Sequence, residues 1–299
     1  MSYFFLFTAA FMWSFVGVLV KTASQNFDSG IITLSRFLFG CCFLVIFLKI
    51  KKIPIRLLWN DKWIWVGMIG KSLNYILENI GITLGFAYGN IIINPVQAIF
   101  LTFVAVWVFN EKMNIQKLIA IFLCLLGVFF VGWKGVPLAD LLGKNLLIII
   151  LYIFASIGAG CHLLSQKKLS AYVDSGNQNL STFLFATFLV MLPLPFTFNV
   201  TGKINPLAIA SLLGLGLITG ISFYLYAEGL KKVPFLIASI ITNSCVLFSL
   251  LWSWLFLKEE INLYVIIGSL MLLLGLVIIN LPDKMVKKII GIHFKEVSI

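Results

Sequence analysis

The stretch DSGIITLSRFLF, residues 28–39, recurs as DSGNQNLSTFLF at residues 174–185. Eight of the twelve positions are identical at an offset of 146 residues. Further along the chain the offset becomes 148, which aligns Glu111 with Glu259. The chain therefore contains two copies of one unit, and the small change of offset indicates a difference in loop length between them.

Apolar runs fill both copies, and most are long enough to cross a bilayer, which takes about 20 residues. Of the 299 residues, 61% are hydrophobic and only 11% are charged, which excludes an ordinary soluble domain. We therefore predict an all-α integral membrane protein with ten transmembrane helices. The predicted helices cover residues 3–21, 31–49, 63–86, 91–109, 115–133, 145–166, 180–198, 207–230, 235–257 and 263–281.

The repeat and the helix count together predict the architecture. Each copy holds five helices, and because five is odd the second copy must cross the membrane in the direction opposite to the first. We expect a first five-helix repeat at residues 1–138, a second, inverted repeat at 139–283 and a basic tail at 284–299. Inverted repeats are characteristic of transporters that alternate access around a site between the two repeats.

The distribution of Lys and Arg predicts the orientation. If the first helix runs outward from the cytoplasm, 15 of these residues fall on the cytoplasmic side and 5 on the other, and Arg36 and Lys71 inside helices complete the 22. The positive-inside rule then places both termini in the cytoplasm, and we expect a cell inner or plasma membrane. These loops explain the net charge of +11, so we expect no nucleic-acid partner. The first apolar run lacks the basic start and small-residue exit of a signal peptide, so we interpret it as the first helix.

The stretch GKSLNYILEN, residues 70–79, places polar side chains inside the third predicted helix. Lys71, Asn74 and Glu78 are spaced i, i+3 and i+7, so they share one helix face, and Asn74 and Tyr75 fall near the middle of the membrane. A charge facing lipid at that depth costs about 3 kcal/mol or more, so we expect this stripe to face the bundle interior. There it would form one wall of a substrate pathway. The alternative is that Lys71 and Glu78 belong to a structural ion-pair network with neighbouring helices.

The second copy contains a milder version of this stripe. The residues that align with the stripe at the offset of 148 are polar or aromatic and carry no charge: Thr219, Ser222, Phe223 and Tyr226. The charge is therefore confined to one copy, as a site for an asymmetric solute would require, and we include Tyr226 among the candidate substrate-binding residues. The alternative is that these side chains only hydrogen-bond between helices.

Two further polar clusters fall near the expected interface of the repeats. Residues 94–97, Asn-Pro-Val-Gln, include a proline that would free a backbone carbonyl inside the fourth helix. Residues 242–244, Thr-Asn-Ser, occupy the equivalent place in the ninth helix. Hydrogen bonds from Asn94, Gln97 and Asn243 to a polar solute are one interpretation, and helix packing is the other.

Glu78 and His162 are the candidate proton-coupling residues. Glu78 is a carboxyl group in a largely apolar helix, and its distance from Lys71 would change if the two halves moved. His162 lies toward the cytoplasmic end of the sixth helix, and imidazole changes its charge near neutral pH. A hydrogen-bonded packing role is the alternative for His162.

Arg36, Glu111 and Glu259 have mainly structural explanations. Arg36 lies inside the outer end of the second helix, where its long side chain would attract an anionic group or reach back to the membrane interface. Glu111 and Glu259 each precede an asparagine, Asn114 or Asn262, by three residues. Both asparagines are suitable N-caps for the helices that follow, so the recurrence favours maintenance of the fold.

A set of aromatic, charged and glycine residues recurs at particular places in or near the predicted helices. They are Trp13, Lys21, Arg36-Phe37, Asn110-Glu111, Lys258-Glu259, Gly127 and Gly275. With these residues, nearly the whole chain resembles the drug/metabolite transporter superfamily and its ten-helix EamA-type transporters. The resemblance implies a carrier of small organic solutes, which in this family include amino acids, nucleosides, cofactors and quaternary amines.

The chain departs from the pattern of that family in two places. The third helix is usually apolar or rich in small residues, whereas this one carries Lys71 and Glu78. A glycine usually precedes the glutamate at the helix end, whereas this chain has Asn110 and Lys258 there. These departures bear on the substrate, because they place charge where the family usually has none.

The sequence contains no phosphate-binding Gly-rich loop, nucleophile elbow or metal-ligand cluster, so we expect no catalytic residues, no metal and no cofactor. The leading hypothesis is a secondary transporter of a small polar organic metabolite, with an amino acid or related zwitterion favoured, that works by alternating access with proton coupling. Its partners would be this small molecule and the lipid bilayer, and a homodimer is compatible with the sequence. The alternatives are a membrane-embedded enzyme or lipid-handling protein that uses Lys71 and Glu78, and a non-transporting sensor or scaffold.

Overall fold

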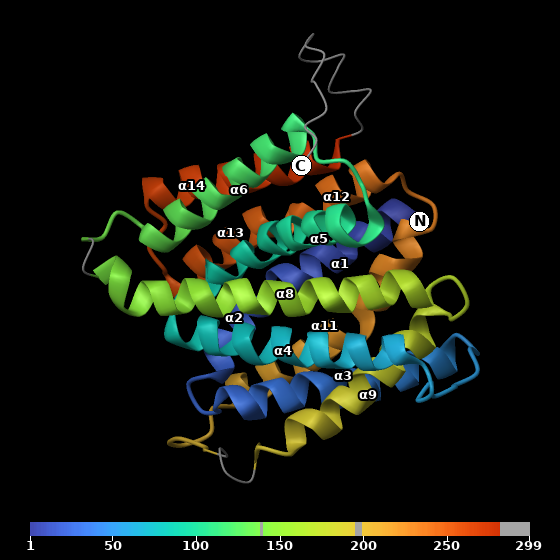
Figure 1. Cartoon of the computed structure of the whole chain (residues 1–299). Helices are drawn as coiled ribbons and strands as arrows, with labels where there is room; N and C mark the ends of the chain where they lie inside the picture. The colour runs from blue at the N-terminus through green and yellow to red at the C-terminus, as the bar shows by residue number, and fades with distance from the viewer. Residues whose placement is uncertain (138–139, 195–198, 282–299) are drawn as a thin grey trace.

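In the computed structural model the chain is a bundle of α-helices packed side by side (Figure 1). The structure describes residues 1–137, 140–194 and 199–281. The expected basic tail at 284–299 and the last residues of the seventh predicted helix, 195–198, lie outside the described residues.

The helices follow one another in two sets. The first half of the chain forms α1 (Ser2–Ser14), α2 (Val16–Ala23), α3 (Ser29–Ile50), α4 (Lys62–Leu84), η1 (Ala87–Ile92), α5 (Ile93–Phe109) and α6 (Ile115–Trp133). The second half forms η2 (Leu141–Asn145), α8 (Leu146–Leu169), α9 (Ser175–Met191), α11 (Pro206–Leu230), α12 (Phe235–Asn243), α13 (Cys245–Leu257) and α14 (Leu263–Asn280). Four spans consist of two consecutive segments each, namely α1 with α2, η1 with α5, η2 with α8 and α12 with α13.

The predicted fold class is confirmed: the chain is all-α, with ten spans in two sets of five. Within the described residues, eight of these spans are long and apolar enough to cross a membrane by length and composition alone. The other two are α4 and α9. α4 carries the polar stripe, and α9 begins with the polar run 177–179. The polar side chains of the stripe and of this run are buried against neighbouring helices, so they need not meet lipid.

The repeated Asp-Ser-Gly motif is a helix N-cap in both halves. The Asp28 side chain accepts a hydrogen bond from the backbone N–H of Ile31 at 2.8 Å, and Asp174 accepts one from Asn177 at 2.9 Å. Such a cap satisfies a backbone donor that has no partner inside the helix. The sequence predicts a helix start at residue 180, but α9 begins at Ser175 because the polar run 177–179 continues the capped helix.

The two asparagines that follow the repeated glutamates also cap helices, as predicted. Asn114 accepts a hydrogen bond from the backbone N–H of Lys117 at 2.8 Å at the start of α6. Asn262 accepts one from Val265 at 3.1 Å at the start of α14. The same local device therefore starts the last helix of each repeat.

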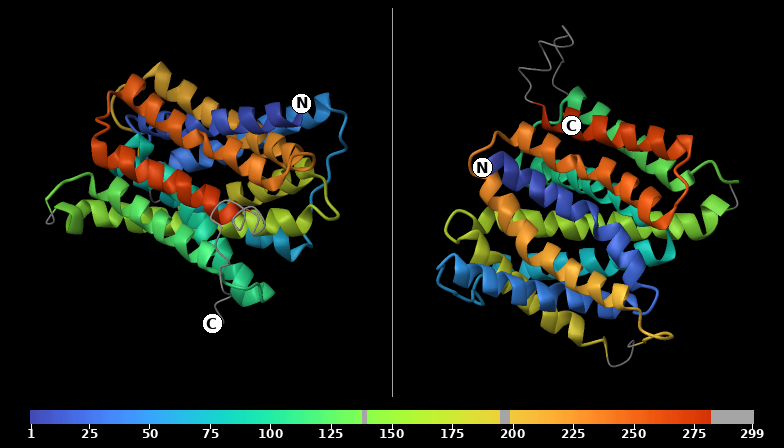
Figure 2. Two further views of the ribbon diagram at one scale, coloured as in Figure 1. Left: turned by 90° about the horizontal axis from the view of Figure 1, so that it is seen from above. Right: turned by 180° about the vertical axis from the view of Figure 1, so that it is seen from behind.

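Helices of one half pack against helices of the other, so the two halves interlock (Figure 2). α4, in the third span of the first half, packs against α8, in the first span of the second half. In the same way α11, the third span of the second half, packs against α1 and α2, the first span of the first half. α6 packs against α14 and α3 against α9, and in both cases the two helices are equivalent spans of the two halves. This exchange of roles is the packing expected of two inverted repeats.

Glycines permit the closest approaches between helices. A Cβ atom added at Gly70 would lie 2.7 Å from the carbonyl oxygen of Gly158, and one added at Gly158 would lie 2.5 Å from that of Gly70. Gly127 and Gly268 are related in the same way between α6 and α14, at 2.8 and 2.9 Å. Small residues allow membrane helices to pack backbone against backbone, and the polar part of α4 is thereby held directly against α8.

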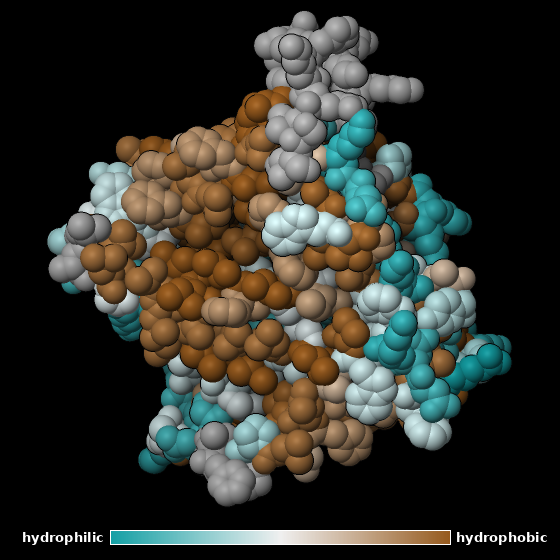
Figure 3. Space-filling model, viewed as in Figure 1, coloured by the Kyte–Doolittle hydropathy of each residue, from teal (hydrophilic) through white to brown (hydrophobic). Residues whose placement is uncertain are grey.

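The surface is divided as a bilayer requires. Figure 3 shows hydrophobic side chains covering the middle of the molecule and hydrophilic ones gathered toward the ends of the helices. Large apolar side chains that would be buried in a soluble protein, such as Trp107, Phe122 and Leu192, are exposed. Lipid tails would cover such a surface.

Candidate functional site

The polar stripe of α4 faces the interior of the bundle, as its cost in lipid predicts. Lys71 is 5% exposed, and Asn74, Tyr75 and Glu78 are also buried. α3, α8 and α9 pack against this helix. The stripe is therefore enclosed by helices from both halves of the chain.

Glu78 forms an ion pair with Arg36 of α3. The Nη1 atom of Arg36 lies 3.0 Å from Glu78 Oε2 and donates a second hydrogen bond to Asn79 Oδ1 at 2.8 Å. The guanidinium carbon lies 3.4 Å from the centre of the Tyr75 ring. Arg36 is only 2% exposed, so the expectation that its side chain reaches back to the membrane interface is wrong: the buried partners hold it inside.

Lys71 has a different set of neighbours. Its Nζ atom donates a hydrogen bond to Asn74 Oδ1 at 3.0 Å and lies between two rings, 4.1 Å from the centre of Tyr75 and 4.3 Å from that of Phe223. Asn74 in turn donates to the carbonyl oxygen of Ala155 on α8 at 3.2 Å. Within the described residues, the ion pairs do not include one between Lys71 and a carboxylate.

The charges buried in this part of the chain do not balance. The buried ionisable side chains with a positive or negative charge are Arg36, Lys71 and Glu78, in the residues that the structure describes. Because Arg36 and Glu78 pair with each other, Lys71 is the buried basic side chain left without a carboxylate partner in these residues.

Residues of the second half complete the surroundings of Lys71. The hydroxyl groups of Tyr75 and Thr219 lie 3.2 Å apart and share a hydrogen bond across the interface between the halves. The indole Nε1 of Trp13 donates to Ser222 Oγ at 2.7 Å. The equivalents of the α4 stripe on α11 therefore meet the first half at the same place.

Aromatic rings extend this wall. The ring of Trp13 lies 5.3 Å from that of Phe223 and 5.2 Å from that of Tyr226, measured between ring centres. Phe223 also lies 5.8 Å from Phe183 of α9. Tyr226, a predicted site residue, is thus joined to the Lys71 region through Trp13 and Phe223.

His162 of α8 belongs to the same neighbourhood. Its ring centre lies 5.6 Å from that of Phe223, so Lys71 and His162 contact the same ring. His162 is 3% exposed, and neither ring nitrogen has a hydrogen-bond partner in the described part of the chain. The backbone of Gly67 lies beside the ring without reaching hydrogen-bond geometry. The two predicted roles of His162, proton coupling and packing, therefore both stay predictions.

The remaining predicted residues lie apart from this cluster. Asn94 donates to Cys245 Sγ at 3.7 Å, so the fourth and ninth spans meet next to the predicted polar cluster 242–244. Asn243 donates to Ser239 Oγ, one turn earlier on its own helix, at 3.1 Å. Gln97 is half-buried on α5. The hydrogen bonds of the described residues do not join these three side chains to the α4 stripe.

Glu259 has a structural contact at one end of the bundle. Both of its carboxylate oxygens accept the backbone N–H of Ala87, at 2.8 and 3.0 Å, where η1 begins. Burial raises the pKa of Glu259, and the hydrogen bond from Ala87 and the nearby Lys21 and Lys134 oppose that rise. This contact agrees with the predicted role in maintaining the fold.

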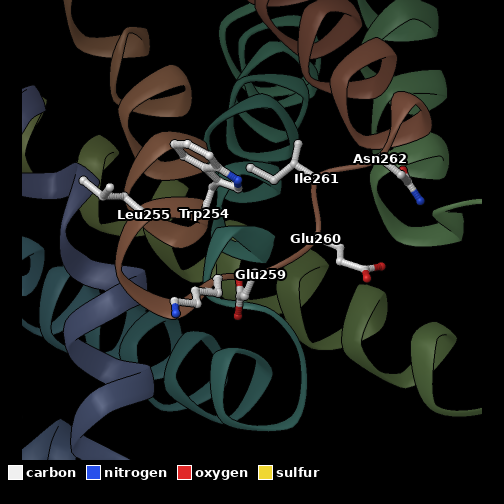
Figure 4. A pocket seen from close by; sticks show the side chains of 7 residues that line it. Trp254, Leu255, Glu259, Glu260, Ile261 and Asn262 are labelled. Atoms are coloured by element: carbon white, nitrogen blue, oxygen red, sulfur yellow. The ribbon is translucent and has the colours of Figure 1, made fainter.

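Glu259 also lines a surface pocket of about 680 Å³ (Figure 4). The lining residues come from the end of α13 and the loop before α14: Trp254, Leu255, Lys258, Glu259, Glu260, Ile261 and Asn262. The residues of the α4 stripe do not line this pocket, so it is separate from the buried cluster around Lys71.

Several residues of this cluster were absent from the predicted site: Trp13, Arg36, Asn79, Phe183, Thr219, Ser222 and Phe223. Arg36 had a usable signal, because it is the only other charged residue deep inside a predicted helix besides Lys71 and Glu78. Buried charges are usually paired, so three such charges indicate a shared cluster. Trp13 and Phe183 had no comparable signal, because the chain has 44 aromatic residues, 8 Trp, 8 Tyr and 28 Phe.

Two segments of the chain, residues 1–133 and 146–281, match the model of the EamA-like transporter family. The chain belongs to this family. Membership shows that this EamA protein is a multi-pass membrane transporter and not an enzyme, so the interpretation of Lys71 and Glu78 as an acid–base pair of an enzyme is wrong. A small-molecule substrate and the bilayer are its partners.

Comparison with solved structures agrees with the fold of an EamA protein. A crystal structure of a protein that is 12% identical in sequence superimposes with a TM-score of 0.70, over 96% of this chain and 97% of that chain. At this identity the likeness shows the fold alone. The search of curated proteins found no match to this chain.

Proposed function

We propose that this EamA protein is a secondary transporter of a small polar organic metabolite, with an amino acid or a related zwitterion favoured. The observation that carries the proposal is the buried ammonium of Lys71, which has Asn74 as its hydrogen-bond partner and no carboxylate partner in the described residues. It lies where side chains of α4 and α11 meet, at the interface of the two repeats. Substrate sites of inverted-repeat transporters are found at such interfaces.

The proposal includes an orientation in a cell inner or plasma membrane with both termini in the cytoplasm. The distribution of Lys and Arg, 15 against 5, supports it. In this orientation the end that carries Lys21, Ala87 and Glu259 is the outer end. The loop between α3 and α4 is then on the inner side.

The mechanism we propose is alternating access, and the ties between the halves support it. One type of tie occurs at both ends of the bundle. Asn26 donates to the carbonyl oxygen of Thr201 at 2.8 Å at one end, and Asn177 donates to that of Pro54 at 2.9 Å at the other. Asn26 lies just before α3 and Thr201 after α9, whereas Asn177 lies at the start of α9 and Pro54 after α3. Since α3 and α9 are the second spans of the two halves, the two hydrogen bonds are related by the symmetry of the repeats.

The repeated glutamates break that symmetry. Glu259 ties the second half to Ala87 of the first half through two hydrogen bonds. Glu111, its equivalent, has a side chain that is 58% exposed and pairs with Lys117 of its own half at 3.2 Å. Glu259 thus links the two halves at one end of the bundle, whereas Glu111 makes no such link at the other end in the described residues. Such a difference is expected of one state of a carrier that opens to each side in turn. In the proposed orientation this conformation is held shut at the outer end.

Proton coupling is part of the proposal, with Glu78 and His162 as the candidate sites. Glu78 is held by Arg36 in this conformation, so its release would require the ion pair to separate as the halves move. His162 has two ring nitrogens without partners in the described residues and lies next to Phe223. Either group would then link a proton to the conformational change.

The test is transport by the purified protein in proteoliposomes. Amino acids and related metabolites would first be screened for thermal stabilisation of the protein, and the stabilising compounds would then be tested for counterflow in radiolabelled form. Lys71→Ala should abolish counterflow, whereas Lys144→Ala, which removes an exposed lysine in η2, should leave it unchanged. If no compound exchanges, or if Lys71→Ala exchanges like the parent, the proposed function is wrong.

Coupling has its own measurement. Under an imposed pH gradient, Glu78→Gln should lose accumulation of the substrate while it keeps some counterflow, because exchange does not need the proton. Accumulation equal to that of the parent would rule out Glu78 as the proton site, and the same experiment with His162→Gln would then test the second candidate.

A further inference from the structure

Two hydrogen-bond donors in the interior, Lys71 and His162, face the same ring without an acidic partner. We propose that these two side chains bind the carboxylate of the substrate and that the site has no matching acidic group for an ammonium. The substrates would then be carboxylic acids with an apolar or aromatic body, and an amino group on them would be dispensable. This inference rests on the proposed function and narrows its substrate class.

Lys71 supplies the charge that selects an acid. An ammonium group can donate three hydrogen bonds, and in the described residues Asn74 Oδ1 accepts one of them. The rings of Tyr75 and Phe223 lie on two sides of the ammonium, but aromatic faces offset only part of the loss of water around a buried cation. A carboxylate beside Lys71 would supply the acidic partner that this side chain lacks in the described residues.

His162 supplies a second donor at the same place. A neutral imidazole carries one N–H, and both ring nitrogens of His162 lack a partner in the described chain although the residue is 3% exposed. α8 brings it close to α4, since a Cβ atom added at Gly70, the neighbour of Lys71, would lie 3.0 Å from the backbone nitrogen of His162. A carboxylate has two oxygens, so one would face each donor.

An ammonium group of the substrate would find no equivalent partner. Glu78 is the only buried carboxylate among the described residues, and Arg36 already occupies it with a second bond to Asn79 that fixes the arginine in place. The other described acids lie at helix ends or in loops: Asp28, Asp61, Glu111, Asp140, Asp174, Glu228, Glu259 and Glu260. The acidic end of a zwitterion is therefore recognised by charge, and its basic end is not.

The shape of the surroundings suits an apolar body. The ring of Phe223 has Trp13 at 5.3 Å and Phe183 at 5.8 Å, measured between ring centres. Tyr226 lies 5.2 Å from Trp13 and continues the same wall. A side chain attached to the bound carboxylate would lie against these rings, where aromatic and aliphatic groups are favoured.

The experiment compares four compounds that differ only in their end groups. Binding of phenylalanine, 3-phenylpropionate, 3-phenylpropionamide and phenethylamine to the full-length protein in detergent would be measured by calorimetry. Phenylalanine and 3-phenylpropionate should bind with similar affinity. The amide and the amine, which lack the carboxylate, should bind about tenfold or more weakly, the loss expected for one charge-assisted hydrogen bond.

Variants assign the effect to the two donors. Lys71→Met should weaken both acids to the level of the amide, and His162→Phe should weaken them by a smaller factor than Lys71→Met does. His162→Gln, which keeps a donor, should retain more affinity than His162→Phe. Lys144→Met, a change at an exposed lysine, should bind like the parent and controls for the loss of any positive charge.

Each outcome decides the question. Failure of all four compounds to bind, equal binding of 3-phenylpropionate and phenethylamine, or binding of phenylalanine about tenfold tighter than 3-phenylpropionate would overturn the inference. Counterflow separates this failure from failure of the proposed function. If amino acids exchange but 3-phenylpropionate neither binds nor exchanges, the carrier function stands and the inference is wrong. If the acids bind as expected but none of the compounds exchanges, the carboxylate site is supported and the proposed transport of these compounds is wrong.

Discussion

Removal of Arg36 should cost more stability than removal of Arg36 and Glu78 together. In Arg36→Met, the carboxylate of Glu78 loses the guanidinium that lies 3.0 Å away, and Asn79 Oδ1 loses a donor at 2.8 Å. Breaking a buried ion pair by deleting one partner costs about 3–5 kcal/mol, because the other charge is left uncompensated. We therefore expect a loss of about 3 kcal/mol or more in the free energy of unfolding.

The double variant Arg36→Met with Glu78→Met removes the orphaned charge. What remains is an unpaired Asn79 acceptor, at a cost of about 1–3 kcal/mol, and the lost stacking of the guanidinium on Tyr75, at about 0.5–2 kcal/mol. Because these neighbouring contributions are not additive, the prediction is an order: the double variant is more stable than Arg36→Met and less stable than the parent. Methionine at both positions keeps apolar bulk in the space and limits cavity effects.

The assay is reversible unfolding in mixed micelles with increasing amounts of a denaturing detergent, followed by tryptophan fluorescence. Glu78→Gln provides an intermediate case, because the amide oxygen still accepts from Arg36 while the charge is lost. The reasoning would be refuted if the double variant were no more stable than Arg36→Met, since the unpaired Glu78 would then not be the cause of the loss. A parent-like Arg36→Met would refute the ion pair itself.

Three other predictions follow from the ends of the bundle. Cysteines introduced at Lys51 and Lys295, in a chain without the native cysteines, should resist an impermeant thiol reagent in intact cells, and labelling of both from outside would overturn the orientation. Glu259→Ala should speed labelling from outside of a cysteine placed at Asn90 on η1, because the tie to the start of η1 is lost, whereas an equal effect of Glu111→Ala would contradict the asymmetry. Asp174→Ala should lower the free energy of unfolding by about 1 kcal/mol through loss of the N-cap, while Asp174→Asn should restore most of it.

The fold was predictable because its determinants are local or repeated. Ten apolar runs of the right length and a duplicated motif are visible in the sequence, and an odd number of spans per repeat requires inversion. The start of α9 was predicted wrongly because hydropathy treats the polar run 177–179 as a loop. The N-cap at Asp174, six residues upstream of the predicted start, begins the helix instead. The interruptions inside spans, such as the one between Asn243 and Cys245, were also missed. Two of them, at Phe15 and Ser244, are single residues with near-helical geometry, which leave no pattern in the sequence.

The site was predictable in part. The inward orientation of Lys71, Asn74 and Glu78 follows from their spacing and from the cost of charge in lipid. The partners of these side chains depend on the rotation and depth of α3, α8 and α11 relative to α4, and hydropathy does not determine either quantity. The sequence therefore predicts that a charged cluster exists, but it leaves open which cation pairs with Glu78.

Physical chemistry explains why Arg36, and not Lys71, holds that place. The guanidinium is planar and carries several donors, so one side chain bonds to Glu78 and Asn79 and stacks on Tyr75 at the same time. An ammonium is a compact charge without a preferred plane, and Lys71 is left with one amide partner and two ring faces. Arg36 has a carboxylate and an amide partner and contributes to the structure, although its Nε has no partner in the described residues. Lys71 has no carboxylate partner there and remains available to a ligand. Because both cations lie within reach of Tyr75, a substrate that neutralises Lys71 would also change the field at the Arg36–Glu78 pair, and this offers a direct physical link between substrate binding and the candidate proton site.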